Sequence, residues 1–326
     1  MPKSPRDLFS LDVFDLKSFI SPYMMIFPPT IFALLILWTN KSFGFIFTHT
    51  VAELISIIIA LTALIVTLVS RHFTQNYFVV FIAIAMGWCG FIDLFHTLLY
   101  KGMYIFPANN ANQAVQLWIG ARLLQAFAML ASPFMLTRLI KPLQLNLFFG
   151  LLSIAIVTAV MQGFFPTAFI EGQGLTPFKI YSEYLIIGIL AIALVLVWKR
   201  RKYLSAQLTF GVCLSMLTMM ASEFAFTKYV SVYADVNLWG HILKVYSYWF
   251  MYLALVEATI KEPFSMLSKA ASTYDTIPDP TYIVNSSQTI QQANLAAGRA
   301  HGTSAAQLTG LSAHELLHDP NVPVTN

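Results

Sequence analysis

The sequence predicts an all-α polytopic membrane protein with about eight transmembrane helices, followed by the start of an α+β domain. The composition, the spacing of the apolar blocks and a change of composition near the C-terminal end predict this together. Of 326 residues, 57% are apolar and only 10% are charged, whereas a typical soluble domain is ~25% charged. So few charges could not cover the surface of a soluble protein of this size.

The apolar residues fall in blocks of about 20, the helix length that crosses a hydrocarbon core ~30 Å thick. Residues 54–68 and 185–197 have almost no polar face, unlike the amphipathic helices of a soluble α protein. The eight expected spans are roughly Phe19–Trp38, Val51–Val69, Tyr77–Leu99, Ala114–Leu136, Leu145–Phe165, Ile180–Trp198, Leu204–Phe226 and Leu238–Ile260. We expect kinks rather than helix ends at Pro28, Pro29 and Pro133, because neighbouring helices can satisfy the backbone groups that proline frees.

Lysine and arginine are distributed unevenly between the two sets of loops. One set holds Lys3, Arg6, Arg71, Arg138, Lys141, Lys199, Arg200, Arg201, Lys202 and Lys261, and the alternate loops hold only Lys41, Lys101, Lys179 and Lys228. Because cytoplasmic loops are enriched in lysine and arginine, we expect both termini in the cytoplasm. The predicted organisation is a cytoplasmic segment over residues 1–17, a membrane unit over 18–265 and a further domain from 266.

The composition changes after Pro263, and residues 266–326 are polar. Thr281–Asn285 and Thr289–Asn294 predict two strands joined by a short turn, and Asn294 is a suitable N-cap for a following helix. A hairpin with short helices is too small to form a stable core by itself. We therefore expect the chain to end inside a domain of a longer protein.

Ionisable residues inside the expected spans are costly in a membrane and are functional candidates for that reason. They lie at one end of their helices, which the charge of the loops places on the extracytoplasmic side. The candidates for binding a ligand or metal are His49, Glu53, Asp93, His96, Glu223 and His241. The supporting charged and polar residues are Lys101, Arg122, Lys179, Glu183, Asn237, Lys244, Trp118 and Tyr100.

The spacing of these residues allows metal binding. His49 and Glu53 are four residues apart and Asp93 and His96 are three apart, so each pair shares one helix face. Histidine and carboxylate pairs on facing helices can coordinate transition metals such as Fe, Zn or Cu, and histidines on facing helices are also compatible with haem.

Other interpretations stay open. The cations and carboxylates are similar in number, so they can neutralise one another in a network that fixes helix packing or surrounds an organic ligand. The histidines can also sense protons. We expect Trp118, Tyr100 and Trp239 to belong to the aromatic belt of the membrane interface.

Five separated motifs closely resemble the third family of membrane-associated sensor (MASE-type) domains, over about residues 15–265. They are H-T-V-A-E from His49, D-L-F-H-T-L-L-Y-K-G-M from Asp93, L-W-I-G-A-R from Leu117, G-L-T-P-F-K-I-Y-S-E-Y from Gly174 and N-L-W-G-H-I-L-K-V-Y-S-Y from Asn237. The following I-P-D-P-T-Y-I-V-N, Q-A-N-L-A-A and L-T-G segments resemble the first half of a PAS domain.

The resemblance implies a sensory receptor of the bacterial inner membrane. In such proteins the membrane sensor and PAS domains usually precede a histidine kinase, diguanylate cyclase or phosphodiesterase, which implies two-component or cyclic-di-GMP signalling and no catalytic residue in this chain. The expected partners are the lipid bilayer, a small ligand or metal ion and a second copy of the chain, with no nucleic acid. The alternative is a membrane oxidoreductase or transporter that has a regulatory tail and uses the histidine and carboxylate cluster as a metal or haem site.

Overall fold

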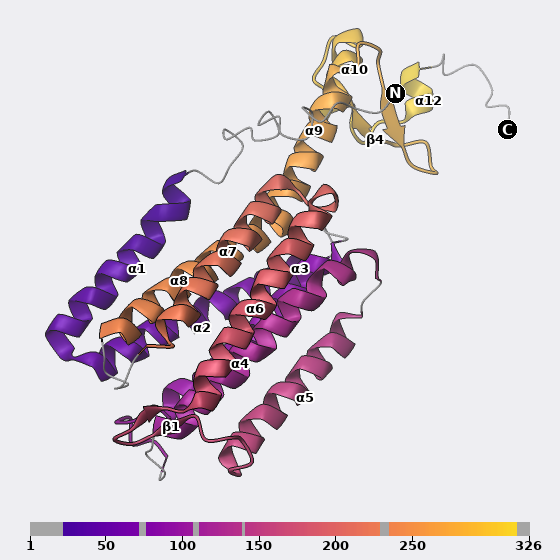
Figure 1. Ribbon diagram of the computed structural model, residues 1–326. Coiled ribbons are helices and arrows are strands. Elements are labelled where there is room, and N and C mark those ends of the chain that lie inside the picture. Colours follow the sequence, from indigo (N-terminus) through magenta and orange to yellow (C-terminus); the bar gives the residue numbers. More distant parts are fainter. Residues whose placement is uncertain (1–21, 72–75, 107–110, 139–140, 229–234, 318–326) are drawn as a thin grey trace, which may run out of the picture. The chain divides into compact units, whose positions relative to one another are not determined.

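The computed structural model describes residues 22–71, 76–106, 111–138, 141–228 and 235–317 (Figure 1). These residues belong to two compact units, Met1–Lys261 and Glu262–Asn326. The expected cytoplasmic segment over residues 1–17, with Lys3 and Arg6, and the first residues of the expected span from Phe19 lie outside the described ranges.

The first unit is a bundle of long helices. Its α-helices are α1 (Pro22–Phe43), α2 (Phe45–Ser70), α3 (Tyr77–Leu98), α4 (Ala111–Ala131), α5 (Pro142–Met161), α6 (Pro177–Arg200), α7 (Ala206–Ala225) and α8 (Asp235–Val256). In the described part of the chain, seven helices are long and apolar enough to cross a membrane. These are α1 to α7, so the chain has the helices of a multi-pass membrane protein. The eighth expected span coincides with α8, whose first turns carry Asn237, His241 and Lys244.

Six of the helices form a closed ring of neighbours. The order around the ring is α2, α3, α4, α6, α7 and α8, and α8 packs against α2 to close it. α1 packs on the outside against α2 and α8, and α5 packs against α3 and α4, so that these two helices lie at opposite sides of the bundle in Figure 1. Burial follows the same division, because 78% of the apolar window of α3 is buried but only 17% of that of α1 and 28% of that of α5.

The prolines behave in two ways. Pro28 and Pro29 lie inside α1, as expected. The expectation of a kink at Pro133 is wrong, since α4 ends at Ala131 and a 3₁₀ helix, η4 (Ser132–Thr137), follows. Proline lacks the N–H that an α-helix needs and its ring clashes with the preceding turn, so the α-helical pattern stops just before it.

The closest approach of two ring helices depends on Gly211. A Cβ atom at this position of α7 would lie 2.7 Å from the Cβ atom of Ala254 on α8 and 3.3 Å from the carbonyl oxygen of Phe250. Small residues let membrane helices approach until their backbones nearly touch. Gly211 and Ala254 therefore set the distance between α7 and α8.

We expect Gly211→Val to destabilise the bundle by about 1–3 kcal/mol, because the added methyl groups force α7 away from α8. The midpoint of thermal unfolding in detergent measures this. Gly188→Ala is the matched control, since a Cβ atom on this glycine of α6 would meet nothing within 4 Å. Equal midpoints for the two variants would contradict the role of Gly211.

A short antiparallel hairpin, β1 (Phe169–Ile170) with β2 (Gly174–Leu175), connects α5 to α6. The side chain of Asn112 at the start of α4 accepts hydrogen bonds from the backbone N–H groups of Ala168 and Phe169, at 2.8 and 3.0 Å. The hairpin is thereby fixed next to the end of the bundle at which α4 and α6 begin.

After α8 the helix continues without a break through a π-helical turn, η6 (Glu257–Lys261), into α9 (Glu262–Thr276) of the second unit. That unit also contains β3 (Tyr282–Val284), β4 (Ile290–Ala293), α10 (Leu295–Ala300), α11 (Ala305–Leu308) and α12 (Ala313–Leu317). β3 and β4 form the expected antiparallel pair. Asn294 is the N-cap of α10, as predicted, and its side chain accepts a hydrogen bond from the backbone N–H of Ala297 at 2.9 Å.

Candidate functional site: a buried ionic cluster

The six ring helices enclose a cluster of ionisable and polar side chains at one end of the bundle. Helices α2, α4, α6 and α8 begin at this end, and α3 and α7 finish there, so helices of both directions contribute. The members are His49 and Glu53 from α2, Asp93 and His96 from α3, Trp118 and Arg122 from α4, Lys179 and Glu183 from α6, Glu223 from α7, and Asn237, His241 and Lys244 from α8. Each is at most 4% exposed, and none comes from the outer helices α1 and α5.

The tightest contact in the cluster joins Asp93 and Arg122. Nη2 of Arg122 donates to both carboxylate oxygens of Asp93, at 2.7 and 2.6 Å. Nη1 of Arg122 donates to the hydroxyl of Tyr248 at 2.9 Å and to Oε1 of Gln125 at 2.7 Å. The Tyr248 hydroxyl donates in turn to Asp93 at 3.1 Å. Charge-assisted bonds of this kind are short and strong, and they connect α3, α4 and α8.

Lys244 links two carboxylates. Its Nζ lies 2.6 Å from Oε2 of Glu53 and 3.0 Å from Oδ2 of Asp93, and it also lies 4.8 Å from the centre of the Trp118 ring. The lysine on α8 is therefore tied to α2 and α3 at once. Any displacement of α8 along its neighbours has to break or rearrange these contacts.

Lys179, Glu183 and Glu223 form the part of the cluster on α6 and α7. Lys179 and Glu183 make an ion pair one turn apart on α6. Nε1 of Trp118 donates to Oε2 of Glu223 at 3.3 Å, whereas the buried Oε1 of Glu223 has no hydrogen-bond partner. The Trp118 ring thus stands between the ion pairs of α2, α3 and α8 and the carboxylates of α6 and α7.

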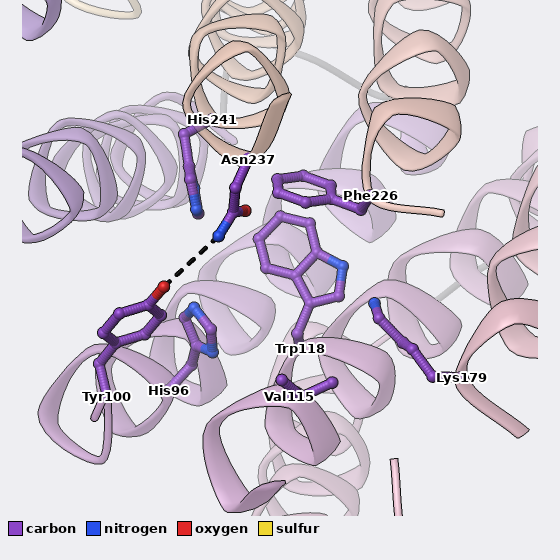
Figure 2. A pocket seen from close by; sticks show the side chains of 8 residues that line it. All are labelled: His96, Tyr100, Val115, Trp118, Lys179, Phe226, Asn237 and His241. Atoms are coloured by element: carbon purple, nitrogen blue, oxygen red, sulfur yellow. Dashed lines mark hydrogen bonds between the residues drawn. The ribbon is translucent and has the colours of Figure 1, made fainter. Parts of the chain in front are cut away.

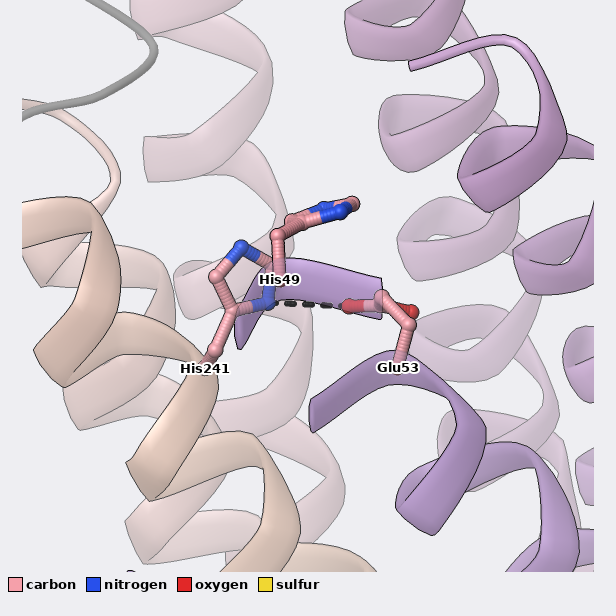
Figure 3. A group of neighbouring side chains, drawn as sticks. All are labelled: His49, Glu53 and His241. Carbon is pink, nitrogen blue, oxygen red and sulfur yellow. Dashed lines mark ion pairs between the residues drawn. The ribbon is translucent and has the colours of Figure 1, made fainter. Parts of the chain in front are cut away.

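Three histidines lie together beside the ion pairs. Nε2 of His49 is 3.2 Å from Nε2 of His96, and the rings of His49 and His241 have centroids 4.7 Å apart. Nδ1 of His241 lies 2.9 Å from Oε1 of Glu53 (Figure 3). One ligand atom each from His49, Glu53 and His241 lies within 4.8 Å of the others, so these side chains are placed to hold a metal ion.

A small cavity opens between the histidines and Trp118. Its lining residues are His96, Tyr100, Val115, Trp118, Lys179, Phe226, Asn237 and His241 (Figure 2). The space open to the centre of a water-sized sphere is about 20 Å³, which is enough for a water molecule or an ion. Pockets for organic ligands are typically about 300–1,000 Å³, so this cavity fits neither haem nor another organic cofactor.

Two expectations about individual residues are wrong. Lys101 is not part of the cluster, because it follows the end of α3 and makes an ion pair with Glu171 of the β1–β2 turn at 2.7 Å. Tyr100 and Trp118 do not belong to an outer aromatic belt. Tyr100 stacks on His49 with centroids 3.7 Å apart, and Trp118 is only 3% exposed. Trp239 is 54% exposed on α8, as the outward-facing position predicted for it requires.

Sequence reasoning missed Tyr248 and Gln125, both of which bind Arg122. Helical spacing carries the signal that could have found them. Tyr248 lies four residues after Lys244 and Gln125 three residues after Arg122, and residues at these spacings share a helix face. Neither residue is ionised at neutral pH, so a search for buried charges does not find them.

Comparisons with known proteins point to a sensory domain. The chain matches the family model MASE3, described as a membrane-associated sensor domain, over residues 41–263. This range includes every member of the buried cluster. No curated protein and no solved structure was found to be significantly similar.

Proposed function

The chain belongs to the MASE3 family of membrane-associated sensor domains, and we propose that it is the sensory input region of a bacterial signal-transduction receptor in the cytoplasmic membrane. In this proposal the buried cluster receives the signal and α8 passes it on. The observation that carries it is the position of α8. Its first turns place Asn237, His241 and Lys244 in the cluster, and its last residue continues without a loop into η6 and α9.

The orientation of the cluster follows from the basic residues. α6 begins with Lys179 and Glu183 in the cluster and ends at the run Lys199–Lys202, most of whose side chains are exposed. Because basic runs of this kind stay on the cytoplasmic side, the cluster belongs near the extracytoplasmic face. α8 is then the eighth span, and both termini are cytoplasmic.

The signal requires an element with two states that the ligand can distinguish. Lys244 supplies a candidate, because it holds α8 to Glu53 and Asp93 at the same time. The π-helical turn η6 supplies a second, since π-turns are rare and occur mostly at functional positions. A ligand that competes for Glu53 would loosen α8 at one end, and the change would reach α9 through η6. The PAS-like region and an output module of the histidine kinase or cyclic-di-GMP type would follow.

A transporter is less well supported by the arrangement. Transport needs polar groups along a path through the whole bundle. Among the described residues of the ring helices, the buried charged side chains all lie in the cluster, and the layer beyond it contains apolar residues such as Ile189, Met216 and Met251. The cavity is also too small for haem, which removes the main support for a haem oxidoreductase.

Hydrogen exchange tests the coupling in the chain itself. In lipid nanodiscs, we expect Lys244→Met and Glu53→Gln to change amide exchange in residues 257–276 by about tenfold, equivalent to about 1.4 kcal/mol in local opening. Trp239→Phe is the control, since this side chain on the same helix faces outward and is 54% exposed. If both cluster variants fold and their exchange in this segment equals that of the wild type, the sensory proposal is wrong.

A further inference from the structure

We propose that the ligand of the cluster is a divalent first-row transition-metal ion held by the Nε2 atoms of His49, His96 and His241. The role of the ion as a signal rests on the proposed sensory function, whereas its binding can be measured separately. Four features of the described residues support the inference: the tautomers of two histidines, the distance between two of their nitrogens, the charge of the cluster and the size of the cavity.

His96 is held in the tautomer that a metal ligand needs. Its Nδ1 lies 2.7 Å from the backbone carbonyl oxygen of Ala114. A carbonyl oxygen only accepts hydrogen bonds, so Nδ1 carries the proton and Nε2 presents a lone pair. Histidines that bind metals almost always donate their other N–H to a carbonyl or carboxylate in this way.

His241 has the same arrangement with a carboxylate in place of the carbonyl. Its Nδ1 is 2.9 Å from Oε1 of Glu53, and Glu53 is itself fixed through Oε2 by Lys244 at 2.6 Å. The carboxylate favours the proton on Nδ1 and leaves Nε2 for the ion. Figure 2 shows His241 and His96 reaching toward each other from α8 and α3 beside the cavity that both line. Glu53 thus serves to orient a ligand.

His49 completes the set. Its Nε2 lies 3.2 Å from Nε2 of His96, close to the separation of about 3.3 Å that two nitrogens have when each is 2.0–2.1 Å from one tetrahedral zinc ion. Without an ion, His49 must donate the proton of this contact, because His96 presents a lone pair. The buried Nδ1 of His49 then has no hydrogen-bond partner. Moving the proton to Nδ1 therefore sacrifices only the contact that the ion replaces.

The charge of the cluster favours a cation. Arg122, Lys179 and Lys244 face four buried carboxylates, Glu53, Asp93, Glu183 and Glu223, so with neutral histidines the cluster carries one net negative charge. Uncompensated charge in a low-dielectric interior is costly. The cavity of about 20 Å³ beside His96 and His241 has room for the ion or a water bound to it. Because the donors are imidazoles, the site suits zinc, copper, nickel or cobalt better than magnesium or calcium.

Metal binding to the purified full chain tests the inference. After treatment with a chelator, the protein is titrated with Co²⁺, whose visible absorption bands report tetrahedral nitrogen coordination, and Zn²⁺ is then added as a competitor. We expect one ion per chain, displaced by Zn²⁺ but not by Mg²⁺. His49→Gln, His96→Gln and His241→Gln should each weaken binding by tenfold or more, since loss of even an orienting partner costs about 10–100-fold. Glu223→Gln is the matched control, because it is buried in the same cluster but is not a ligand.

The outcomes separate the two proposals. Failure of the wild type to bind Co²⁺ or Zn²⁺ at micromolar concentrations, or equal binding by folded histidine variants, overturns the metal site whatever hydrogen exchange shows. If a histidine variant does not fold, Glu53→Gln replaces it, with weaker binding expected and unchanged binding contradicting the assigned role of Glu53. Binding of Zn²⁺ that leaves the exchange of residues 257–276 unchanged confirms the ion but makes it structural, and overturns its role as a signal.

Discussion

Replacing Arg122 with methionine is expected to destabilise the folded bundle by about 3–5 kcal/mol, because it leaves the Asp93 carboxylate buried and without its main partner. Both side chains are inaccessible to solvent, so water cannot replace the lost bonds. Tyr248 and Lys244 still contact Asp93 and hold the effect below the full cost of an isolated buried charge. The free energy of unfolding in mixed micelles measures the loss.

A double variant distinguishes the value of the pair from the cost of breaking it. Asp93→Leu combined with Arg122→Met removes both charges, and replacing a buried ion pair by apolar residues is often close to neutral. We expect the double variant to recover most of the stability that the single variant loses, with a coupling energy of about 0.5–3 kcal/mol. Arg201→Met is the control, since this arginine lies outside the cluster and stacks on Trp198. Additive losses in the double variant would show that the two side chains act independently.

Much of the fold could be predicted from the sequence because a membrane restricts the possibilities. Every backbone polar group in a bilayer must be satisfied internally, so an apolar block of sufficient length has to be a helix. The convergence of the charged residues at one end could also be predicted, because successive spans run in opposite directions. Glu53 near the start of α2 and Asp93 near the end of α3 then lie at the same level.

The choice of partners could not be predicted. It depends on the rotation of each helix about its axis, which side-chain packing determines and apolar blocks do not. Nothing in the sequence alone pairs Arg122 with Asp93 while Lys179 pairs with Glu183. The same uncertainty affects the aromatic residues. Trp118 and Trp239 lie at the same end of the bundle, but one faces the ring interior and the other faces outward.

The cluster is arranged so that the aromatic residues separate its charges from solvent. Trp118 contacts Phe226, with ring centroids 4.4 Å apart, and His96, with centroids 5.6 Å apart. It also lies within 5.0 Å of the Arg122 guanidinium. A cation over an aromatic face is stabilised more strongly when water is excluded. This tryptophan therefore contributes both apolar packing and electrostatic stabilisation to the site.

We expect Trp118→Ala to cost about 3–5 kcal/mol in unfolding free energy, the usual range for truncating a buried tryptophan, and to enlarge the cavity beside His96 and His241. Trp118→Phe keeps most of the ring and loses only the bond to Glu223 at 3.3 Å, so its loss should be about 1–3 kcal/mol. Thermal unfolding compares the variants, and binding of free imidazole, a molecule too large for the native cavity, reports the added space. Because the metal ligands are untouched, Trp118→Phe should bind Co²⁺ as the wild type does. A loss of Co²⁺ binding in this folded variant would mean that the ring, and not only the histidines, determines whether the site can close around an ion.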